Sequence, residues 1–407
     1  LGIGPIVTAS ILLQLLVGAG IMKLDLTNNI RDQQYFQNLQ KTLVFVMSAM
    51  TALPFAFAGT FLVPSEQLAA QFGVSTFIIQ IALFLQIFVG GVIILYLDEI
   101  VSKWGVGSGV GLFIVAGVSQ RLIGGLFSWE GLGYLGIFPY WFDVILGKRS
   151  LPTNVADFLL GQPQILAVIT TLAVAAIVIY TESVKINVPV HNSRVQGAKG
   201  SYPIKLIYAS VLPMILVRAL QSNVQFIGQI LNDALGKSMP SWLGVYSNGQ
   251  PVDGFFYFIN PITTQSEWMW FMGSTTQEVW KILLRVGIDI TIMVVLGAVF
   301  AVFWVETTGM GPEQTAEKIK SRGMSIPGFR NNTSVMGTVL DRYIPYVTVL
   351  GGAIVGFLAV VTNLLGTIGT VNGLGLLLTI SILYKMFSEL AEQEMYRKMN
   401  NLKNVFK

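Results

Sequence analysis

The residue types that carry most enzyme and metal chemistry are scarce in this chain. It has 407 residues, no cysteine and a single histidine, His191. Thiolate nucleophiles, Cys-ligated metals and disulfides are therefore excluded, and histidine-based acid–base chemistry has one candidate at most. Neither a Gly-x-Ser-x-Gly nor a His-Glu-x-x-His motif is present. The sequence predicts a protein that is not an enzyme and has no cofactor or metal site.

Arg218, Arg285 and Asp289 are ionisable residues within apolar stretches, where a charged side chain costs a few kcal/mol. Arg218 lies in a run of amides that includes Asn223. This run predicts contact with a water-filled cavity or a movable helix; the alternative is an arginine that reaches the outer interface. Arg285 and Asp289 are four residues apart on one helical face, which predicts an ion pair in preference to a proton relay.

The composition indicates which elements position these residues. Hydrophobic residues make up 53% of the chain and charged residues only 11%, against roughly 25% in soluble domains. The mean hydropathy is +0.66. So few charges cannot cover a soluble protein, and disordered chains have low hydrophobicity and high charge. The composition predicts an all-α, polytopic membrane protein.

Nine apolar stretches approach or reach the roughly 20 residues that a membrane helix needs. They cover residues 5–20, 42–63, 74–97, 106–127, 163–180, 203–231, 282–305, 343–366 and 373–390. Most of the 25 basic residues flank alternate connections, whereas the other connections hold only Lys148, Arg149 and Lys237, with Lys281 at a boundary. By the positive-inside rule, the basic connections are cytosolic.

Two large cytosolic connections, 181–202 and 306–342, are predicted to form basic prongs. They serve only to fix topology and contact anionic lipid, or they dock an anionic partner such as ribosomal RNA. The sequence leaves both interpretations open. The candidate docking residues are Lys185, Arg194, Lys199, Lys318, Lys320, Arg322 and Arg330.

Several motifs spread along the chain carry a family resemblance. They are residues 1–16 (LGIGPIVTASILLQLL), 96–109 (YLDEIVSKWGVGSG), 197–205 (GAKGSYPIK), 303–309 (FWVETTG) and 328–330 (GFR). In this order they resemble the SecY family, the channel subunit of the Sec protein translocon, in its archaeal and eukaryotic branch. The resemblance covers essentially the whole chain.

The resemblance implies a ten-helix channel built from two pseudo-symmetric halves. The nine stretches correspond to the second half of the family's second helix through its tenth. The first helix and the small plug helix are expected to be missing from this sequence. The implied organisation is an N-terminal half at 1–127, an external connector at 128–162 and a C-terminal half at 163–407.

The resemblance also assigns site residues. The family's pore ring is apolar, and a hydrophobic constriction resists wetting and ion leak. The matching positions are Ile3, Val7, Val110, Ile114, Ile215 and Leu378. The positions that match the family's lateral gate, through which apolar segments leave sideways into lipid, are Thr8, Gln14, Thr51 and Asn223.

The implied function is a protein-conducting channel for secretory polypeptides. Its implied partners are a SecE/gamma-like subunit, a small beta subunit, the ribosome, signal peptides, nascent chains and membrane lipid. Arg194 and Arg330 match positions that the family uses for docking. The implied location is the archaeal plasma membrane in preference to the endoplasmic reticulum.

Two other classes of membrane protein are alternatives to a channel. A secondary transporter with inverted repeats and broken helices would also fit the short first stretch. It should, however, carry convergent charged or ion-binding groups near the midplane, which the sequence does not show. An intramembrane protease is disfavoured because paired intramembrane aspartates are missing from the sequence.

Overall fold

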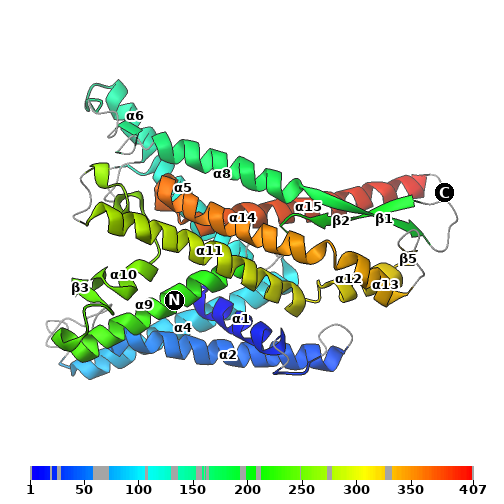
Figure 1. The fold of residues 1–407 in the computed structure, drawn as a ribbon, viewed down its shortest axis with the longest axis horizontal. Helices are drawn as coiled ribbons and strands as arrows, with labels where there is room; N and C mark the ends of the chain where they lie inside the picture. Colours follow the sequence, from blue (N-terminus) through cyan, green and yellow to red (C-terminus); the bar gives the residue numbers. More distant parts are fainter. Residues whose placement is uncertain are drawn as a thin grey trace. The chain divides into compact units, whose positions relative to one another are not determined.

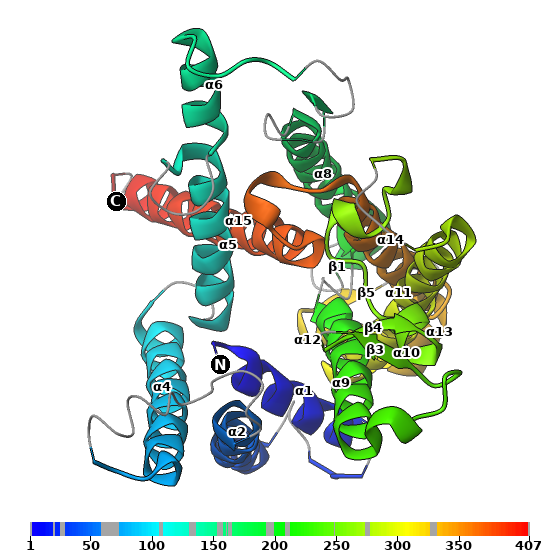
Figure 2. The ribbon, with the colours of Figure 1, turned by 90° about the vertical axis from the view of Figure 1, so that its left-hand side faces the viewer.

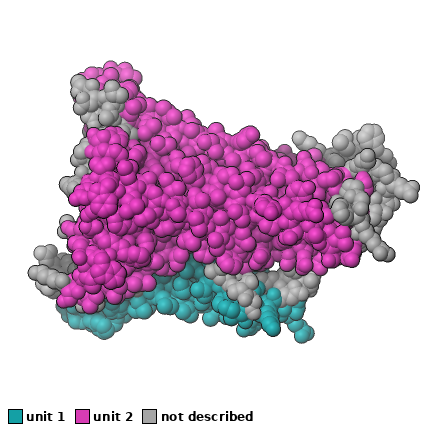
Figure 3. All heavy atoms as spheres, in the orientation of Figure 1, with its two compact units in different colours: residues 1–114 teal, residues 115–407 magenta. Residues whose placement is uncertain are grey.

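The computed structural model describes the chain with gaps. The described residues are 2–18, 21–24, 29–57, 73–105, 109–129, 136–152, 158–159, 161, 165–192, 199–207, 212–247, 249–272, 277–325 and 332–405. They form two compact units, Leu1–Ile114 and Val115–Lys407, which Figure 3 shows in teal and magenta. Both units are mainly helical, as predicted, and the larger one also holds two small sheets.

The first unit is a packed set of apolar helices. Its elements are α1 (Gly4–Gly18), α2 (Ile30–Phe57), α4 (Thr76–Trp104) and the first turns of α5 (Gly109–Phe127). Helix α2 packs against both α1 and α4. Their buried contact includes Ile6, Ala9, Val44 and Leu95, and Val110 of α5 packs against this cluster.

Two side chains near the end of α4 position the start of α5 in this unit. Asp98 Oδ1 accepts a hydrogen bond from the backbone N–H of Val110 (2.7 Å), and Ser102 Oγ accepts one from Gly109 (3.1 Å). These side chains satisfy amides that the helix itself leaves unpaired. A side chain at Gly109 would overlap Asp98, so the close approach requires glycine there.

The second unit is larger, and its long helices are α8 (Ile165–Ser183), α9 (Leu212–Leu235), α11 (Val279–Thr307), α14 (Ile344–Leu365) and α15 (Gly373–Val405). Helices α11 and α14 lie side by side (Figures 1 and 2). A Cβ at Gly352 or Gly356 would overlap backbone carbonyls of α11. Small residues thus allow the two backbones to approach closely.

The two predicted cytosolic prongs are joined into one platform. Strand β1 (Lys185–Asn192) pairs antiparallel with β2 (Lys199–Lys205) and, through its last residues, with β5 (Met324–Ser325). Helices α12 (Pro312–Ser321) and α13 (Thr333–Leu340) pack beside this sheet, at one end of α11 and α14 (Figure 1). The shared core includes Val188, Val190, Ile204, Ala316, Ile319, Met336 and Leu340.

The opposite end of the second unit carries short elements. They are α6 (Ile137–Ile145), η2 (Gly236–Ser238), β3 (Val245–Ser247), β4 (Gln250–Asp253), α10 (Phe255–Ile259), η3 (Gln265–Glu267) and η4 (Trp270–Met272). A further short turn, η5 (Ile368–Thr370), connects α14 to α15. These short elements lie around the ends of the long helices that are opposite the platform.

Each of the nine predicted apolar stretches overlaps a helix, and parts of several, such as 58–63, lie outside the described residues. Seven helical segments of the described chain are long and apolar enough to cross a membrane. Helix α1 is short, and α9 is interrupted by polar residues. The predicted stretch 203–231 began too early, because Pro203–Lys205 belong to β2 and α9 starts at Leu212.

Candidate functional site

One face of α9 concentrates polar side chains inside the second unit. Arg218, Gln221 and Gln225 follow a spacing of three and four residues, so they lie on the same side of the helix. Gln221 is only 2% exposed, and Gln225 donates a hydrogen bond to the carbonyl oxygen of Phe256 (2.9 Å). On another side of the helix, Asn223 is exposed.

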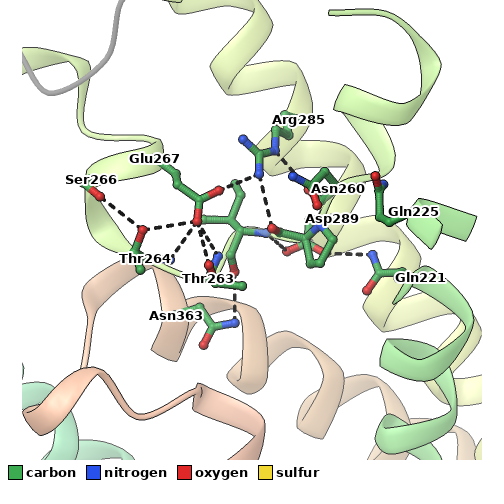
Figure 4. Close-up of polar contacts among 12 residues, drawn as sticks. Gln221, Gln225, Asn260, Thr263, Thr264, Ser266, Glu267, Arg285, Asp289 and Asn363 are labelled. Carbon is green, nitrogen blue, oxygen red and sulfur yellow. Dashed lines mark hydrogen bonds and ion pairs between the residues drawn. The ribbon is translucent and has the colours of Figure 1, made fainter. Parts of the chain in front are cut away.

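The centre of this polar face is a buried carboxylate from α11. Asp289 is 1% exposed and forms an ion pair with Arg218, at 2.9 Å between Oδ1 and Nη1. It also accepts hydrogen bonds from Gln221 Nε2 (3.1 Å) and from the backbone N–H of Ile262 (3.3 Å). A charge removed from water is tolerated only when it is paired and hydrogen-bonded, and Asp289 meets both conditions. Figure 4 shows its hydrogen bond with Gln221.

A second, partly buried ion pair lies one turn along α11. Arg285 contacts Glu267 of η3 at 2.6 Å and donates to the carbonyl oxygens of Asn260 (3.0 Å) and Pro261 (3.2 Å). Burial alone would raise the pKa of the Glu267 carboxyl. The positive charge of Arg285 and hydrogen bonds from Thr263 outweigh burial and lower this pKa below its ordinary value of 4.5.

The amide of Asn363 connects this network to α14 and α15. Its Nδ2 donates to the carbonyl oxygen of Ile262 (3.0 Å), and its Oδ1 accepts from the backbone N–H of Gly373 (2.6 Å). Residues 260–267 are therefore held between α9, α11 and α14, and Figure 4 shows the side chains converging on this segment.

The network positions helices and is unsuited to moving protons. It contains two arginines and two carboxylates, and each arginine forms an ion pair with one of the carboxylates. A guanidinium does not deprotonate in proteins, so no proton can pass through Arg218 or Arg285. The predicted pairing of Arg285 with Asp289 is replaced by two separate pairs, because each side chain has a closer partner on another element.

No metal site accompanies the network in the part of the chain that the structure describes. Within those residues, no group of three His, Asp or Glu side chains could hold a metal ion.

The six predicted pore-ring positions lie on or directly before four different helices. Ile3 precedes α1 and Val7 lies within it; Val110 and Ile114 lie on α5, Ile215 on α9 and Leu378 on α15. All are half-buried except Leu378, which is 6% exposed. Within the first unit, Val110 packs against the cluster that holds Ile6 and Ala9 of α1. Within the second unit, α9 contacts α15. The closed ring itself stays a prediction.

The predicted gate residues differ in how their polar groups are used. The Thr8 hydroxyl donates to the carbonyl oxygen of Gly4 (2.9 Å) and the Thr51 hydroxyl to that of Met47 (2.6 Å). Such bonds within a helix satisfy the hydroxyl without a second helix. Asn223 is exposed on α9, and the side chain of Gln14 lies outside the described structure.

Some of the predicted docking residues are exposed on the platform, and the others, or their side chains, lie outside the described part of the chain. Lys185, Lys318, Lys320 and Arg322 are exposed on the platform. Lys318 and Lys320 also hold it together, because they donate to the Gly309 carbonyl oxygen (2.8 Å) and the Thr333 hydroxyl (3.2 Å). Arg194 and Arg330 lie outside the described residues, as does the side chain of Lys199.

Comparison with known proteins identifies the family to which this arrangement belongs. A family model described as SecY matches residues 1–387. The chain belongs to the SecY family. The protein translocase subunit SecY of Haloferax volcanii is 56% identical over 411 residues, which cover 100% of this chain and 84% of that protein. SecY of Archaeoglobus fulgidus is 48% identical over 409 residues, covering 97% and 82%.

Solved structures of SecY relatives share the fold. A structure described as that of a protein conducting channel is 36% identical and has a TM-score of 0.73, covering 97% of this chain and 81% of that chain. Sec61 in the canine ribosome-channel complex from the endoplasmic reticulum is 34% identical, with a TM-score of 0.70 and the same coverage. A secondary transporter is not favoured, because these relatives are named as translocase subunits and channels.

The sequence located Arg218, Arg285 and Asp289 of the polar network but missed Glu267 and Asn363. Glu267 stands in the sequence Thr263–Thr264–Gln265–Ser266–Glu267, where Thr264 and Glu267 form a capping box. This spacing signals a helix start. It could have drawn attention to the segment, but it does not indicate that an arginine of α11 lies beside the glutamate.

Proposed function

We propose that this chain is the channel subunit through which secretory polypeptides cross the archaeal plasma membrane. It also releases apolar signal and transmembrane segments sideways into lipid, and it carries no catalytic chemistry of its own. The observation that carries this proposal is the match to a solved protein-conducting channel over 97% of the chain, together with aliphatic residues at all six ring positions.

The mechanism follows from the chemistry of the ring. Aliphatic side chains offer no fixed hydrogen-bond partner, so an unfolded polypeptide slides past them without being held. The same side chains repel water, and the closed passage therefore resists ions. An apolar segment leaves toward lipid because each Leu or Ile gains a few tenths of a kcal/mol there.

The proposed roles of the segments follow the two halves of a SecY-family channel. Residues 1–127 and 163–407 form the halves, and 128–162 connect them on the outer side. Thr8, Gln14, Thr51 and Asn223 face the lateral gate. SecE/gamma-like and small beta subunits brace the channel, and the translating ribosome docks on the platform through Lys185, Arg194, Lys199, Lys318, Lys320, Arg322 and Arg330.

Crosslinking of a stalled nascent chain tests the channel directly. Photoreactive probes at Ile3, Ile114 and Ile215 should each react with a secretory chain held in transit. A probe at Ile179, an exposed residue of α8, serves as the control and should react with lipid instead. If all three ring probes fail to reach the nascent chain, the pore assignment is wrong.

Reversing one charge on the platform tests docking. Arg330→Glu should weaken ribosome binding about tenfold or more, because a hydrogen bond to a charged group contributes about 1.5–3 kcal/mol. Binding is measured by cosedimentation at moderate salt. Lys237→Glu, on the predicted outer side, is the matched control and should leave binding unchanged. Equal ribosome affinity of Arg330→Glu and the unmodified protein would contradict the docking role.

A further inference from the structure

Helix α6 has one buried and one exposed apolar side. Ile137 and Tyr140 are 7% and 3% exposed, whereas Phe138, Phe142 and Ile145 are 55%, 51% and 80% exposed. The spacing of four and three residues places the exposed side chains along one side of the helix. An apolar side of this size needs a cover, because contiguous exposed hydrophobic surface marks a membrane or ligand contact.

An apolar groove of about 490 Å³ lies along this side of α6. Its walls come from α6 and from the end of α5. Phe127 stacks on Phe138 with 5.0 Å between ring centroids, and Trp129 packs edge-on against Phe142 at 6.2 Å. All lining residues are aromatic or aliphatic, and the volume falls within the roughly 300–1,000 Å³ of small-molecule sites.

Two adjacent cations come shortly after Ile145, the last groove-lining residue, in the sequence. Gly147, with φ of 73°, ends the helix, and Lys148 and Arg149 come next. Lys148 is exposed, and Arg149 lies 3.9 Å from Asp143. The predicted outer connections hold few basic residues, so this neighbouring pair is a local exception to the positive-inside pattern.

The groove suits a hydrocarbon chain better than a peptide. Apart from indole N–H groups, its lining has no hydrogen-bonding side chain, so the backbone amides of a bound peptide would be left unpaired. Helix α5 is a candidate membrane span that ends at Phe127, and an aromatic lining at the end of a span is typical of the headgroup region. Lys148, together with Arg149 that also lies beside Asp143, follows the groove in the sequence and matches an amphiphile with a negative head.

We propose that the groove between α6 and the outer end of α5 binds an anionic phospholipid of the outer leaflet. A hydrocarbon chain lies along Phe127, Phe138 and Phe142, and the phosphate lies at Lys148 and Arg149. The bound lipid would anchor the connector that joins the two proposed halves of the channel to the membrane surface.

Native mass spectrometry of the channel with its partner subunits tests this site. The complex is released from nanodiscs that contain equal amounts of phosphatidylglycerol and phosphatidylcholine with the same chains. The unmodified protein should retain phosphatidylglycerol preferentially. Replacing both cations, Lys148→Ala with Arg149→Ala, should reduce that preference about thirtyfold, since each cation near a membrane surface contributes a factor of about five.

Matched variants separate headgroup binding from chain binding. The exchange Lys148→Arg with Arg149→Lys keeps both charges and should keep the preference. Phe142→Ala should reduce retention of both lipids, whereas Phe303→Ala, which removes a similarly exposed ring from α11, should not. Equal retention of phosphatidylglycerol by the unmodified protein and the double-alanine variant would overturn the proposal. Lipid binding by the isolated chain but not by the complex would also overturn it, because a partner subunit would then cover the groove.

Discussion

Asp289→Ala will destabilise the second unit by about 3–5 kcal/mol. The change removes the partner of Arg218 and leaves a guanidinium that is 12% exposed without its counter-charge. It also leaves Gln221 and the Ile262 amide without their acceptor. The free energy of unfolding in detergent, followed by tryptophan fluorescence, measures the effect.

Two further variants test whether the loss of stability comes from the buried Asp289–Arg218 pair. Asp253→Ala breaks an ion pair with Lys281 in which the carboxylate is 44% exposed, and it should cost less than about 1 kcal/mol. Combining Asp289→Leu with Arg218→Met removes both charges and should cost clearly less than Asp289→Ala alone. If Asp289→Ala and Asp253→Ala prove equally mild, Asp289 does not hold α9 against α11.

Ile215→Asn will increase ion leak through the closed channel. Burying one isoleucine side chain contributes about 1.5–3 kcal/mol, so replacing it with an amide lowers the cost of wetting by a similar amount. We expect conductance in planar bilayers to increase on the order of tenfold, and signal selectivity to loosen. Ile114→Asn should act in the same direction from α5.

The control for the leak is a polar replacement away from the proposed ring. Val295 is 52% exposed on α11, and Val295→Asn should leave conductance near that of the unmodified protein. A leak that is unchanged in Ile215→Asn and Ile114→Asn would show that these side chains do not seal the passage. A leak that increases equally in all three variants would indicate general loosening of the fold.

These predictions concern two properties of the same helix. The inner part of α9 carries Ile215 of the proposed ring, and its middle carries Arg218 and Gln221, which fix it to α11 through Asp289. We propose that this attachment keeps α9 with the C-terminal half when the gate opens.

The helical part of the fold was readable from the sequence. Apolar stretches of about 20 residues can satisfy their backbone hydrogen bonds in lipid only as helices. The nine stretches were therefore predicted to be helical. The residues at which the helices begin and end were harder to predict. Pro203–Lys205 continue the apolar stretch of α9 but pair with β1 instead, because a strand partner was available in the preceding loop.

The platform, which is predicted to be cytosolic, could not be derived without the tertiary structure. In β1, buried Val188 and Val190 alternate with exposed neighbours, and this period of two could have predicted a strand. Nothing local indicated that β5, more than a hundred residues later, would pair with its end. Separate basic prongs were therefore expected where the structure has one sheet and one shared core.

The sequence by itself determined the class of molecule and the chemistry available to it, and it predicted a sidedness. Hydrophobicity and charge act residue by residue, so composition and spacing are sufficient for these conclusions. Only the tertiary structure decided which charges neutralise one another. Arg285 and Asp289 share a helical face, yet each takes a partner from another element, Glu267 or Arg218. Short-range ion pairs depend on distances across the fold, and helical spacing gives those distances only within one helix.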